Sequence, residues 1–464
     1  MAIDTGTQAA LQRAALVMVL LNAFTTPLML SAVNVALPAI AFDLKLDAVR
    51  LSWVPMVYLM ASAMFVLAFG RLADMYGRKR VFLAGTTGVI VTSLIAAAAT
   101  GGEWLIGARF LQGMSAAMLY ATQMAIVSSV FPPARRGHAI GLTVSMVYLG
   151  LTGGPVIGGL LIDHFGWRSA FIFHVPLAAI VLLIGLLKVP GEWAADERGS
   201  FDFAGAAVYG ITVAAVCTGV SLLPRIAGFL ALAASAVGLW LFIRMARRAH
   251  HPLFDVSLFY SNRVFSLSCL AAYIIYTAIF ANVVLISLYL QYLKGVTASQ
   301  AGMIMMTQPL AMAILSPFAG KLSDRIEPRL IASAGMAITT AGLILLARLD
   351  SASSMPYIVG ALLITGLGFS LFSSPNANAI LGAVEKRYYG SATGSLATMR
   401  LLGQMSSMAL VTLVFALIIG QVEIRPPVYP SLLQAIQIAF TLAAFLCVPG
   451  IVFSLARGRM HGDP

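Results

Sequence analysis

The sequence predicts an all-α polytopic membrane protein with about fourteen membrane-spanning helices. Of its 464 residues, 60% are hydrophobic and only 10% are charged, and the mean hydropathy is +0.93. Soluble domains carry roughly 25% charged residues, so a soluble fold is excluded. Apolar runs of about 20 residues recur along the whole chain, each long enough to cross a hydrocarbon layer of roughly 30 Å. Runs such as VFLAGTTGVIVTSLIAAAAT lack the alternation of barrel strands, which leaves helices.

Fourteen apolar stretches follow one another, and each is interpreted as one helix. Two of the joins between them are irregular, so twelve or thirteen spans remain alternatives. The first stretch runs into the second without a small-residue cleavage site, which predicts a retained helix and not a signal peptide. The three cysteines fall inside apolar stretches at no metal-ligand spacing, so no metal site is expected. The expected spans lie near residues 13–33, 51–70, 81–100, 104–130, 138–162, 169–187, 203–222, 226–243, 264–288, 299–319, 330–347, 355–375, 391–419 and 433–455.

Basic residues test this topology, because cytoplasmic loops of membrane proteins carry an excess of Lys and Arg. With the amino terminus in the cytoplasm, 20 of the 29 Lys and Arg residues fall in cytoplasmic segments and 7 in outer ones. The other two, Arg109 and Arg400, fall inside spans. The split predicts an inner-membrane protein with both termini in the cytoplasm. It also accounts for the net charge of +12 without a nucleic-acid partner.

An internal repeat divides the chain. GRLADMYGRKR at 70–80 and GKLSDRIEPR at 320–329 each follow an expected helix and share a Gly, basic, Leu, x, Asp core. Their spacing of 250 residues holds about eight spans and not six, so two helices are inserted between related halves. We expect a six-helix bundle over 1–187, a linker with the two inserted helices over 188–250, and a second six-helix bundle over 251–464.

Four segments stand out for their order and spacing: NVALPAI after the first helix, GRLADMYGRKR between the second and third, LIGARFLQG in the fourth and GLTGGPVIGG in the fifth. Together they resemble the major facilitator superfamily, specifically its fourteen-helix drug:proton antiporter branch. FDFAG at the start of the seventh helix and HHPLFDVSLF before the ninth resemble that branch in particular. The resemblance covers nearly the whole chain, and it implies the major facilitator fold with two pseudo-symmetric six-helix bundles.

The loop at 70–80 is the candidate gate. Gly70 and Gly77 permit a tight turn, and Asp74 sits among basic residues where it can bind another helix end. The resemblance implies that this loop stabilises the outward-facing arrangement, with Asp74 and Arg78 as gate residues. The alternative is a set of solvated charges that only orient the protein. The second copy, with Asp324, lacks the trailing Gly-Arg-Lys and is expected to be structural.

Glycines in the fifth helix form a smooth face, since Gly150, Gly154 and Gly158 recur at every fourth residue. Pro155 removes a backbone hydrogen bond in the middle of that face and predicts a bend. Generic small-residue packing explains the glycines but not the complete Gly-Pro-x-x-Gly-Gly string that ends at Gly159. The resemblance identifies this string as the antiporter motif, which favours export over uptake.

Two arginines lie within apolar helices, where a cation costs about 2.5–3.5 kcal/mol on insertion scales. Arg109 is therefore expected to face a cavity or a partner, and Gln112 shares its helix face. The resemblance implies a role for Arg109 in proton coupling. Arg400 has Gln404 one turn further on, and it either faces a cavity or extends its side chain to the membrane interface.

The sequence departs from the branch at one informative position. The branch usually carries an acid in its first helix where this chain has Met29, and none of the 17 acidic residues is expected at mid-membrane. His174, in place of a usual Asn, is a candidate titrating group because imidazole changes charge near neutral pH, although an ordinary polar role is also open. Asp163 and Glu103 are candidates in the outer half.

The remaining cavity candidates are polar or aromatic residues on inner spans, which suit drug-sized ligands. They accompany Arg400 and Gln404 and are Asn34, Tyr58, Gln123, Tyr148, Tyr276, Gln308, Asn376 and Asn378.

The leading functional interpretation is proton-coupled efflux of amphiphilic small molecules by alternating access, with the proton gradient in place of any cofactor. The missing acid and the buried arginines favour an alternative, a proton-independent or symport-type carrier of an anionic or neutral metabolite. A receptor or scaffold would leave Arg109 unexplained. No phosphate-binding loop and no catalytic constellation are visible, so neither ATP-driven pumping nor an enzyme is expected. We expect protons, the substrate and membrane lipid as partners, and a functional monomer.

Overall fold

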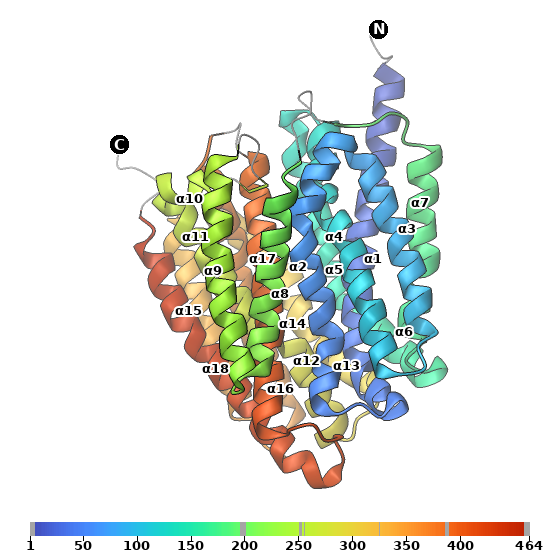
Figure 1. The fold of residues 1–464 in the computed structure, drawn as a ribbon, viewed down its shortest axis with the longest axis vertical. Coiled ribbons are helices and arrows are strands. Elements are labelled where there is room, and N and C mark those ends of the chain that lie inside the picture. The colour runs from blue at the N-terminus through green and yellow to red at the C-terminus, as the bar shows by residue number, and fades with distance from the viewer. Residues whose placement is uncertain are drawn as a thin grey trace.

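The computed structural model describes residues 5–194, 201–249, 253–254, 256–323, 325–385 and 389–458. In these ranges the chain is helical with no β-strand, and fourteen helical segments are long and apolar enough to cross a membrane. They run side by side in one bundle of helices (Figure 1). We call the end of the molecule where α1 begins and α18 ends the terminal end, and the opposite end the far end.

The first six spans pack among themselves. α1 packs against α5, α2 against α4, and α3 against both α4 and α7. The sixth span is interrupted at Phe173 and His174, so it forms a short helix followed by a longer one. The elements are α1 (Thr5–Leu44), α2 (Ala48–Tyr76), α3 (Arg78–Ala97), α4 (Gly102–Val130), α5 (Pro133–Phe165), α6 (Ser169–Ile172) and α7 (Val175–Leu187).

The next two spans, α8 (Phe203–Leu222) and α9 (Ile226–Arg248), form a helical hairpin. α8 packs against α2 of the first six spans and against α17 of the last six. α9 packs against α8 and exposes large apolar side chains such as Phe229 and Trp240. The hairpin therefore lies over the junction between the two groups of six, as the green helices of Figure 1 show.

The last six spans form the second group. α15 packs against α16 and α18, α14 against α16, and α11 against α17 and α18. The ninth span changes from α-helix to a π-helix, here η1, before it ends. The elements are α10 (Ser257–Ser261), α11 (Arg263–Ile279), α12 (Asn282–Leu288), η1 (Tyr289–Leu293), α13 (Ala298–Met305), α14 (Thr307–Ser323), α15 (Pro328–Ala347), α16 (Met355–Gly382), α17 (Tyr389–Ile418), the 3-10 turn η3 (Pro426–Val428) and α18 (Tyr429–Ala456).

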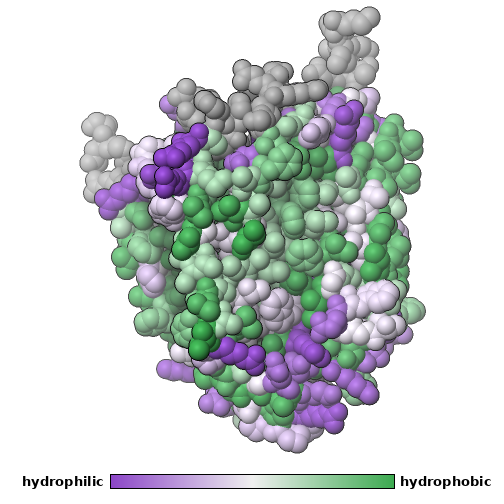
Figure 2. Space-filling model, viewed as in Figure 1, coloured by the Kyte–Doolittle hydropathy of each residue, from purple (hydrophilic) through white to green (hydrophobic). Residues whose placement is uncertain are grey.

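The surface has the pattern of a membrane protein. A hydrophobic belt covers the middle of the face seen in Figure 2, and hydrophilic residues gather toward both ends. Large apolar side chains such as Leu187, Phe318 and Phe445 are exposed on this or other faces. A soluble monomer would not expose so much apolar surface, so the belt is the region that contacts lipid.

The fourteen-span count is confirmed, but the expected helix ends are corrected in two respects. The NVALPAI segment lies inside α1 and not after it, because α1 continues through Pro27 and Pro38 to Leu44. Neighbouring helices can satisfy the backbone groups that a proline frees in a membrane helix. Gly70 likewise lies inside α2, so only Gly77 forms the predicted turn, with φ at +113°.

The two groups of six touch at the far end. The backbone amide of Ala48 donates to the carbonyl of Val422 at 3.0 Å, beside a β-bridge between Asp47 and Glu423. One turn deeper, the hydroxyl of Ser52 on α2 donates to that of Thr412 on α17 at 2.8 Å. Together with the contact between α5 and α13 described below, these bonds close the far end.

Candidate functional site

Arg109 is the centre of a buried polar network in the first six spans. Its side chain is fully buried on α4. Nε donates to the carbonyl of Val54 at 3.2 Å, and Nη1 donates to Oε1 of Gln112 at 2.5 Å. The guanidinium lies over the ring of Tyr58, 4.3 Å from its centroid, in cation–π geometry. The structure therefore holds Arg109 between a backbone carbonyl, an amide and an aromatic face.

Gln112 extends the network to two more helices. Its amide donates to Ser93 Oγ on α3 at 2.6 Å, and it lies 3.2 Å from the sulfur of Met29 on α1. Ser93 Oγ is in turn 3.0 Å from Nε2 of His174. The structure thus brings Arg109, Gln112, His174 and the anomalous Met29 into one site, whereas the sequence predicted only that Arg109 and Gln112 share a helix face.

The hydrogen bonds of Ser93 determine the tautomer that suits His174. A hydroxyl carries a single proton, and the hydroxyl of Ser93 donates its proton to the carbonyl oxygen of Val89, 2.6 Å from Oγ. His174 Nε2 must then carry the proton and donate to Ser93. Its Nδ1 is buried without a hydrogen-bond partner and keeps a free lone pair. Nδ1 is therefore the basic atom of this site.

No carboxylate neutralises Arg109 in the part of the chain that the structure describes. Its recorded polar partners are all neutral, and its Nη2 makes no hydrogen bond. A buried, unpaired cation is costly in a membrane and is retained where it has a function. The network is accordingly the strongest candidate site in the molecule.

A second cluster lies between the two groups of six. Arg400 on α17 is only partly buried. α17 packs against α11, where a Cβ on Gly403, one turn from Arg400, would lie 2.8 Å from the Cβ of Tyr276, and it also touches α4, which carries Tyr120. The hydroxyl of Tyr120 is 3.1 Å from that of Tyr58, whose ring contacts Arg109. Tyr120 is therefore joined through Tyr58 to the Arg109 network. Sequence analysis missed Tyr120, because a tyrosine on an apolar helix gives no distinguishing signal.

The glycines of the antiporter motif face two different helices. A Cβ on Gly154 would lie 2.7 Å from the carbonyl oxygen of Leu28 on α1, and one on Gly158 would lie 2.6 Å from the Cβ of Ala32. Gly150 faces the same helix. Gly159 instead faces the backbone of Ala298 on α13, in the last six spans. The motif thus permits close contact of α5 with a partner in each group.

Asp163, near the far end of α5, makes the contact that crosses between the groups. Its two carboxylate oxygens accept from the backbone amides of Ala298 at 3.2 Å and Ser299 at 2.9 Å. Those amides belong to the first turn of α13, where a negative charge is favourable. Glu103, the other outer-half candidate, is exposed beside Arg50 and lies outside both polar clusters.

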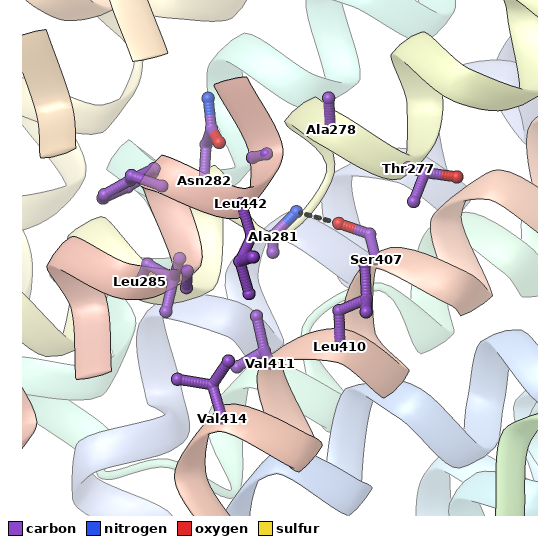
Figure 3. Close-up of a pocket in the computed structure, with 13 residues that line it drawn as sticks. Thr277, Ala278, Ala281, Asn282, Leu285, Ser407, Leu410, Val411, Val414 and Leu442 are labelled. Atoms are coloured by element: carbon purple, nitrogen blue, oxygen red, sulfur yellow. Dashed lines mark hydrogen bonds between the residues drawn. The ribbon is translucent and has the colours of Figure 1, made fainter. Parts of the chain in front are cut away.

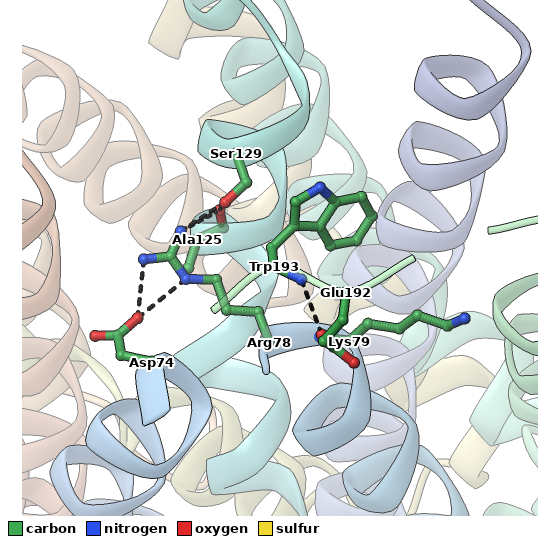
Figure 4. A network of polar contacts seen from close by, with 7 residues as sticks. All are labelled: Asp74, Arg78, Lys79, Ala125, Ser129, Glu192 and Trp193. Atoms are coloured by element: carbon green, nitrogen blue, oxygen red, sulfur yellow. Dashed lines mark hydrogen bonds and ion pairs between the residues drawn. The ribbon is translucent and has the colours of Figure 1, made fainter. Parts of the chain in front are cut away.

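The candidate gate loop is held by contacts on its own side of the molecule. Arg78 Nε and Nη2 donate to Asp74 at 3.0 and 2.8 Å, and Nη1 donates to Ser129 Oγ at 2.5 Å on α4 (Figure 4). Gly77, at the start of α3, supplies the positive φ. Asp324, in the second copy of the motif, lies outside the described residues.

Glu192, in the segment that follows α7, caps this loop, and no sequence signal pointed to it. Its carboxylate accepts from the backbone amides of Lys79 at 2.7 Å and Arg80 at 3.1 Å, in the first turn of α3. The backbone of Arg78 also donates to the carbonyl of Trp193 at 2.8 Å. The linker is therefore joined to the candidate gate, as Figure 4 shows.

The family model of the Major Facilitator Superfamily matches residues 19–280 and 268–462, which is nearly the whole chain. The chain belongs to the major facilitator superfamily. Its fold is that of this family, with two six-helix bundles and two additional helices between them. We call these the first bundle, the second bundle and the α8–α9 hairpin.

Relatives of this major facilitator protein are named as transporters. Riboflavin transporter RibZ of Clostridioides difficile is 31% identical over 448 residues, which cover 95% of this chain and 96% of that protein. Multidrug resistance protein Stp of Mycobacterium tuberculosis is 32% identical over 391 residues, 83% of this chain and 72% of that protein. The protein is therefore a polytopic membrane transporter of the major facilitator type.

A solved structure supports the fold. A bacterial homologue of the human lysosomal transporter Spinster, in an inward-facing and unoccupied conformation, superposes with a TM-score of 0.71 over 98% of both chains. Its sequence is only 14% identical, so the likeness concerns the fold alone.

Several predicted cavity residues of this transporter have structural partners instead. Gln123 accepts from Asn22 at 2.7 Å, and Asn378 donates to Ser323 at 2.8 Å. Asn34 and Gln308 are buried, and the side-chain oxygen of Asn34 has no partner. Gln404 is partly buried, one turn from Arg400. Tyr148 reaches toward Ser373 across the bundles, at 3.4 Å between the two oxygens.

Arg457 is a second buried arginine, and it is one of the 20 basic residues that the sequence interpretation placed in cytoplasmic segments. It is 1% exposed at the end of α18, and its Nη1 donates to Asn376 Oδ1 at 2.7 Å and to Ser268 Oγ at 3.1 Å. Asn376, a predicted cavity residue, therefore anchors α18 to α16. Because Arg457 directly follows the last apolar run, hydropathy alone could not distinguish it from an orienting charge.

A small cavity lies within the second bundle, at the break between α11 and α12 (Figure 3). The backbone amide of Ala281 leaves its helix there and donates to Ser407 Oγ at 3.1 Å. The amide group of Asn282 beside it is buried without partners. The cavity volume of about 20 Å³ suits a water molecule and is far below that of a drug-sized ligand. This cavity is therefore not the substrate site.

Proposed function

We propose that this protein exports amphiphilic small molecules across the bacterial plasma membrane in exchange for protons, by alternating access of its two bundles. The observation that carries the proposal is the buried network of Arg109, Gln112, Ser93 and His174, beside a helix with a complete Gly-Pro-x-x-Gly-Gly string. The names of relatives such as Stp support export of drugs. The protein acts as a carrier and not as an enzyme, and one chain contains both bundles that the mechanism needs.

The distribution of basic residues supports placing the terminal end in the cytoplasm. In that orientation the closed far end faces outward, and substrate enters from the cytoplasm. Opening toward the outside then requires Asp163 to release the amides of α13. Closing the cytoplasmic end requires the loop of Asp74 and Arg78 to approach the second bundle.

Met29 leaves two groups to carry the proton. His174 can accept a proton at Nδ1. The added charge would then lie in the same hydrogen-bonded network as Arg109. Asp163 can accept one at the far-end closure, where neutralisation weakens its hold on α13. Protonation at either site would be coupled to a change of conformation or to the Arg109 network.

A second candidate is a proton-independent or symport-type carrier of an anionic or neutral metabolite. Among the described residues no carboxylate pairs with Arg109, which favours this candidate, as does the name of the riboflavin transporter RibZ. The two candidates differ in whether substrate movement produces proton flux.

The deciding experiment uses the purified protein in liposomes with an internal pH-sensitive dye and an imposed proton gradient. The amphiphilic dyes rhodamine 123 and fluorescein are added in turn. We expect dye-stimulated proton flux in the wild type and its loss in Arg109→Ala and His174→Asn. The matched control is Arg425→Ala, at an exposed far-end loop position. Dye movement that is indifferent to the proton gradient would replace the antiporter with the second candidate.

A further inference from the structure

Arg400 lies well inside α17, a helix that packs against both bundles. It is 11 residues from the start of that helix and 18 from its end, or about 17 Å and about 27 Å. Tyr120 and Tyr276 lie at least ten residues from the ends of their own spans. Arg400 belongs to the second bundle and Tyr120 to the first, so the cluster lies between the two parts that move against each other.

The charge of Arg400 is not neutralised in the part of the chain that the structure describes. In those ranges its guanidinium forms no ion pair with a carboxylate. It is only partly buried, which leaves its donors free for a ligand. Arg109 differs, because that guanidinium is fully buried and has protein partners.

The acidic residues of the described ranges stand at or near the ends of spans, away from this depth. A carboxylate that could attract a cationic ligand is therefore missing beside Arg400. The described acidic residues are Asp43, Asp47, Glu103, Asp163, Asp350 and Glu423 toward the far end, and Asp74, Glu192, Asp202, Glu327 and Glu385 toward the terminal end.

Aromatic side chains lie on the helices that neighbour α17. Tyr276 packs edge-on against Phe369 at 5.5 Å between ring centroids. Tyr120 pairs with Tyr58 through their hydroxyls. Aromatic faces stack on flat rings, and a guanidinium binds carboxylates and other oxyanions with its paired donors.

We propose that Arg400, with Tyr120 and Tyr276, forms the specificity site of the transporter and selects planar aromatic molecules that are anionic or neutral, against lipophilic cations. The inference rests on the proposed transport function and gives its substrate class. A cation at this depth meets the repulsion of Arg400 with no nearby carboxylate to offset it. A flat aromatic anion meets both an oxyanion partner and stacking surfaces.

The test uses two dyes that share one xanthene ring system and differ in charge, fluorescein as the anion and rhodamine 123 as the cation. Binding to the purified full-length protein is measured by fluorescence polarisation, and transport is measured in liposomes. We expect the wild type to prefer fluorescein by about tenfold or more. Arg400→Gln should abolish the preference, Arg400→Glu should invert it, and Arg400→Lys should keep most of it. Arg425→Gln, which removes an exposed arginine, should leave it unchanged.

Equal binding of the two dyes by the wild type, or an unaltered preference in Arg400→Gln, would overturn the inference. If the Glu variant fails to fold, the wild-type preference and the Gln and Lys variants still decide the question. The proposed antiport is judged separately by dye-stimulated proton flux. Selective movement of fluorescein without proton flux would refute antiport and support the specificity site. Equal proton flux with the two dyes would support antiport and refute the specificity site.

Discussion

Met29 shows how one residue can alter the chemistry of a site without altering its shape. Its sulfur lies 3.2 Å from the amide nitrogen of Gln112, and Gln112 binds Arg109. An acid at this position would reach the same network and give Arg109 a counter-charge. With methionine in its place, the network keeps a net positive charge at all ordinary pH values, since arginine does not lose its proton there.

Met29→Glu should therefore change which compounds drive proton flux. A carboxylate beside Gln112 can bind both a proton and a cation, so we expect rhodamine 123 to stimulate proton flux more strongly than in the wild type. The measurement is the liposome assay with the pH-sensitive dye. Met29→Gln, of similar size and without charge, is the control, and equal flux in the two variants would show that position 29 does not reach the coupling site.

At the residue level, the sequence was informative where a polar or charged side chain lies in an apolar segment. Arg109 and Gln112 are polar groups on an apolar helix, and their three-residue spacing predicted that they share one face. Tyr120, Glu192 and Arg457 were missed because each is ordinary in its local sequence. Their roles arise from contacts with helices distant in the chain, such as that of Glu192 with the first turn of α3, and only the fold brings those together.

At the scale of elements, α5 is the helix whose packing is most demanding, because it touches α1 with one face and α13 with another. The pattern of glycines predicted a smooth face. It did not predict that Gly159 would pack against α13 of the second bundle, since periodicity does not identify which helix a face contacts.

Gly154→Ala tests this packing, and Gly153→Ala is a matched neighbour. A Cβ at Gly154 would lie 2.7 Å from the Leu28 carbonyl, whereas at Gly153 the nearest atom is the Leu28 Cδ1 at 3.4 Å. We expect the first variant to lower the thermal midpoint by several degrees and to reduce transport strongly, and the second to do little. Equal effects would indicate generic helix weakening. The measurements are thermal unfolding in detergent and dye transport.

The linker segment that holds Glu192 predicts a second element-scale effect. Glu192→Gln removes the charge that caps α3, and such caps contribute about 1 kcal/mol. We expect the loop of Asp74 and Arg78 to become more open to amide hydrogen exchange, with slower transport. Glu103→Gln, an exposed acid at the start of α4, should change neither. Unchanged exchange at Lys79 and Arg80 would rule out the capping role.

The whole molecule is closed at the far end in this structure, and the carboxylate of Asp163 on α5 bonds there to the backbone of α13. Hydropathy predicted all fourteen spans because each span must by itself be long and apolar enough to cross the membrane. It could not predict the breaks at Phe173, Phe280 or Met306, which depend on packing between helices.

Asp163→Asn should shift the two bundles toward the arrangement that is open at the far end. An amide keeps one acceptor oxygen but loses the charge that favours the first turn of α13. Spin labels at His138→Cys on α5 and Ser391→Cys on α17, both exposed near the terminal end, should come closer together in double electron–electron resonance. An unchanged distance would remove Asp163 from the closure.

The α8–α9 hairpin makes the two seams between the bundles inequivalent. In a twelve-helix carrier the pseudo-twofold axis would leave the seam at α2 and α17 and the seam at α5 and α14 equally exposed to lipid. Here α8 covers the first seam by packing on both α2 and α17, while α5 meets α13 and α14 at the second without such a cover. The hairpin therefore separates the seam at α2 and α17 from the bilayer, whereas an amphiphile that diffuses within the bilayer can contact the seam at α5 and α14 without meeting α8 or α9.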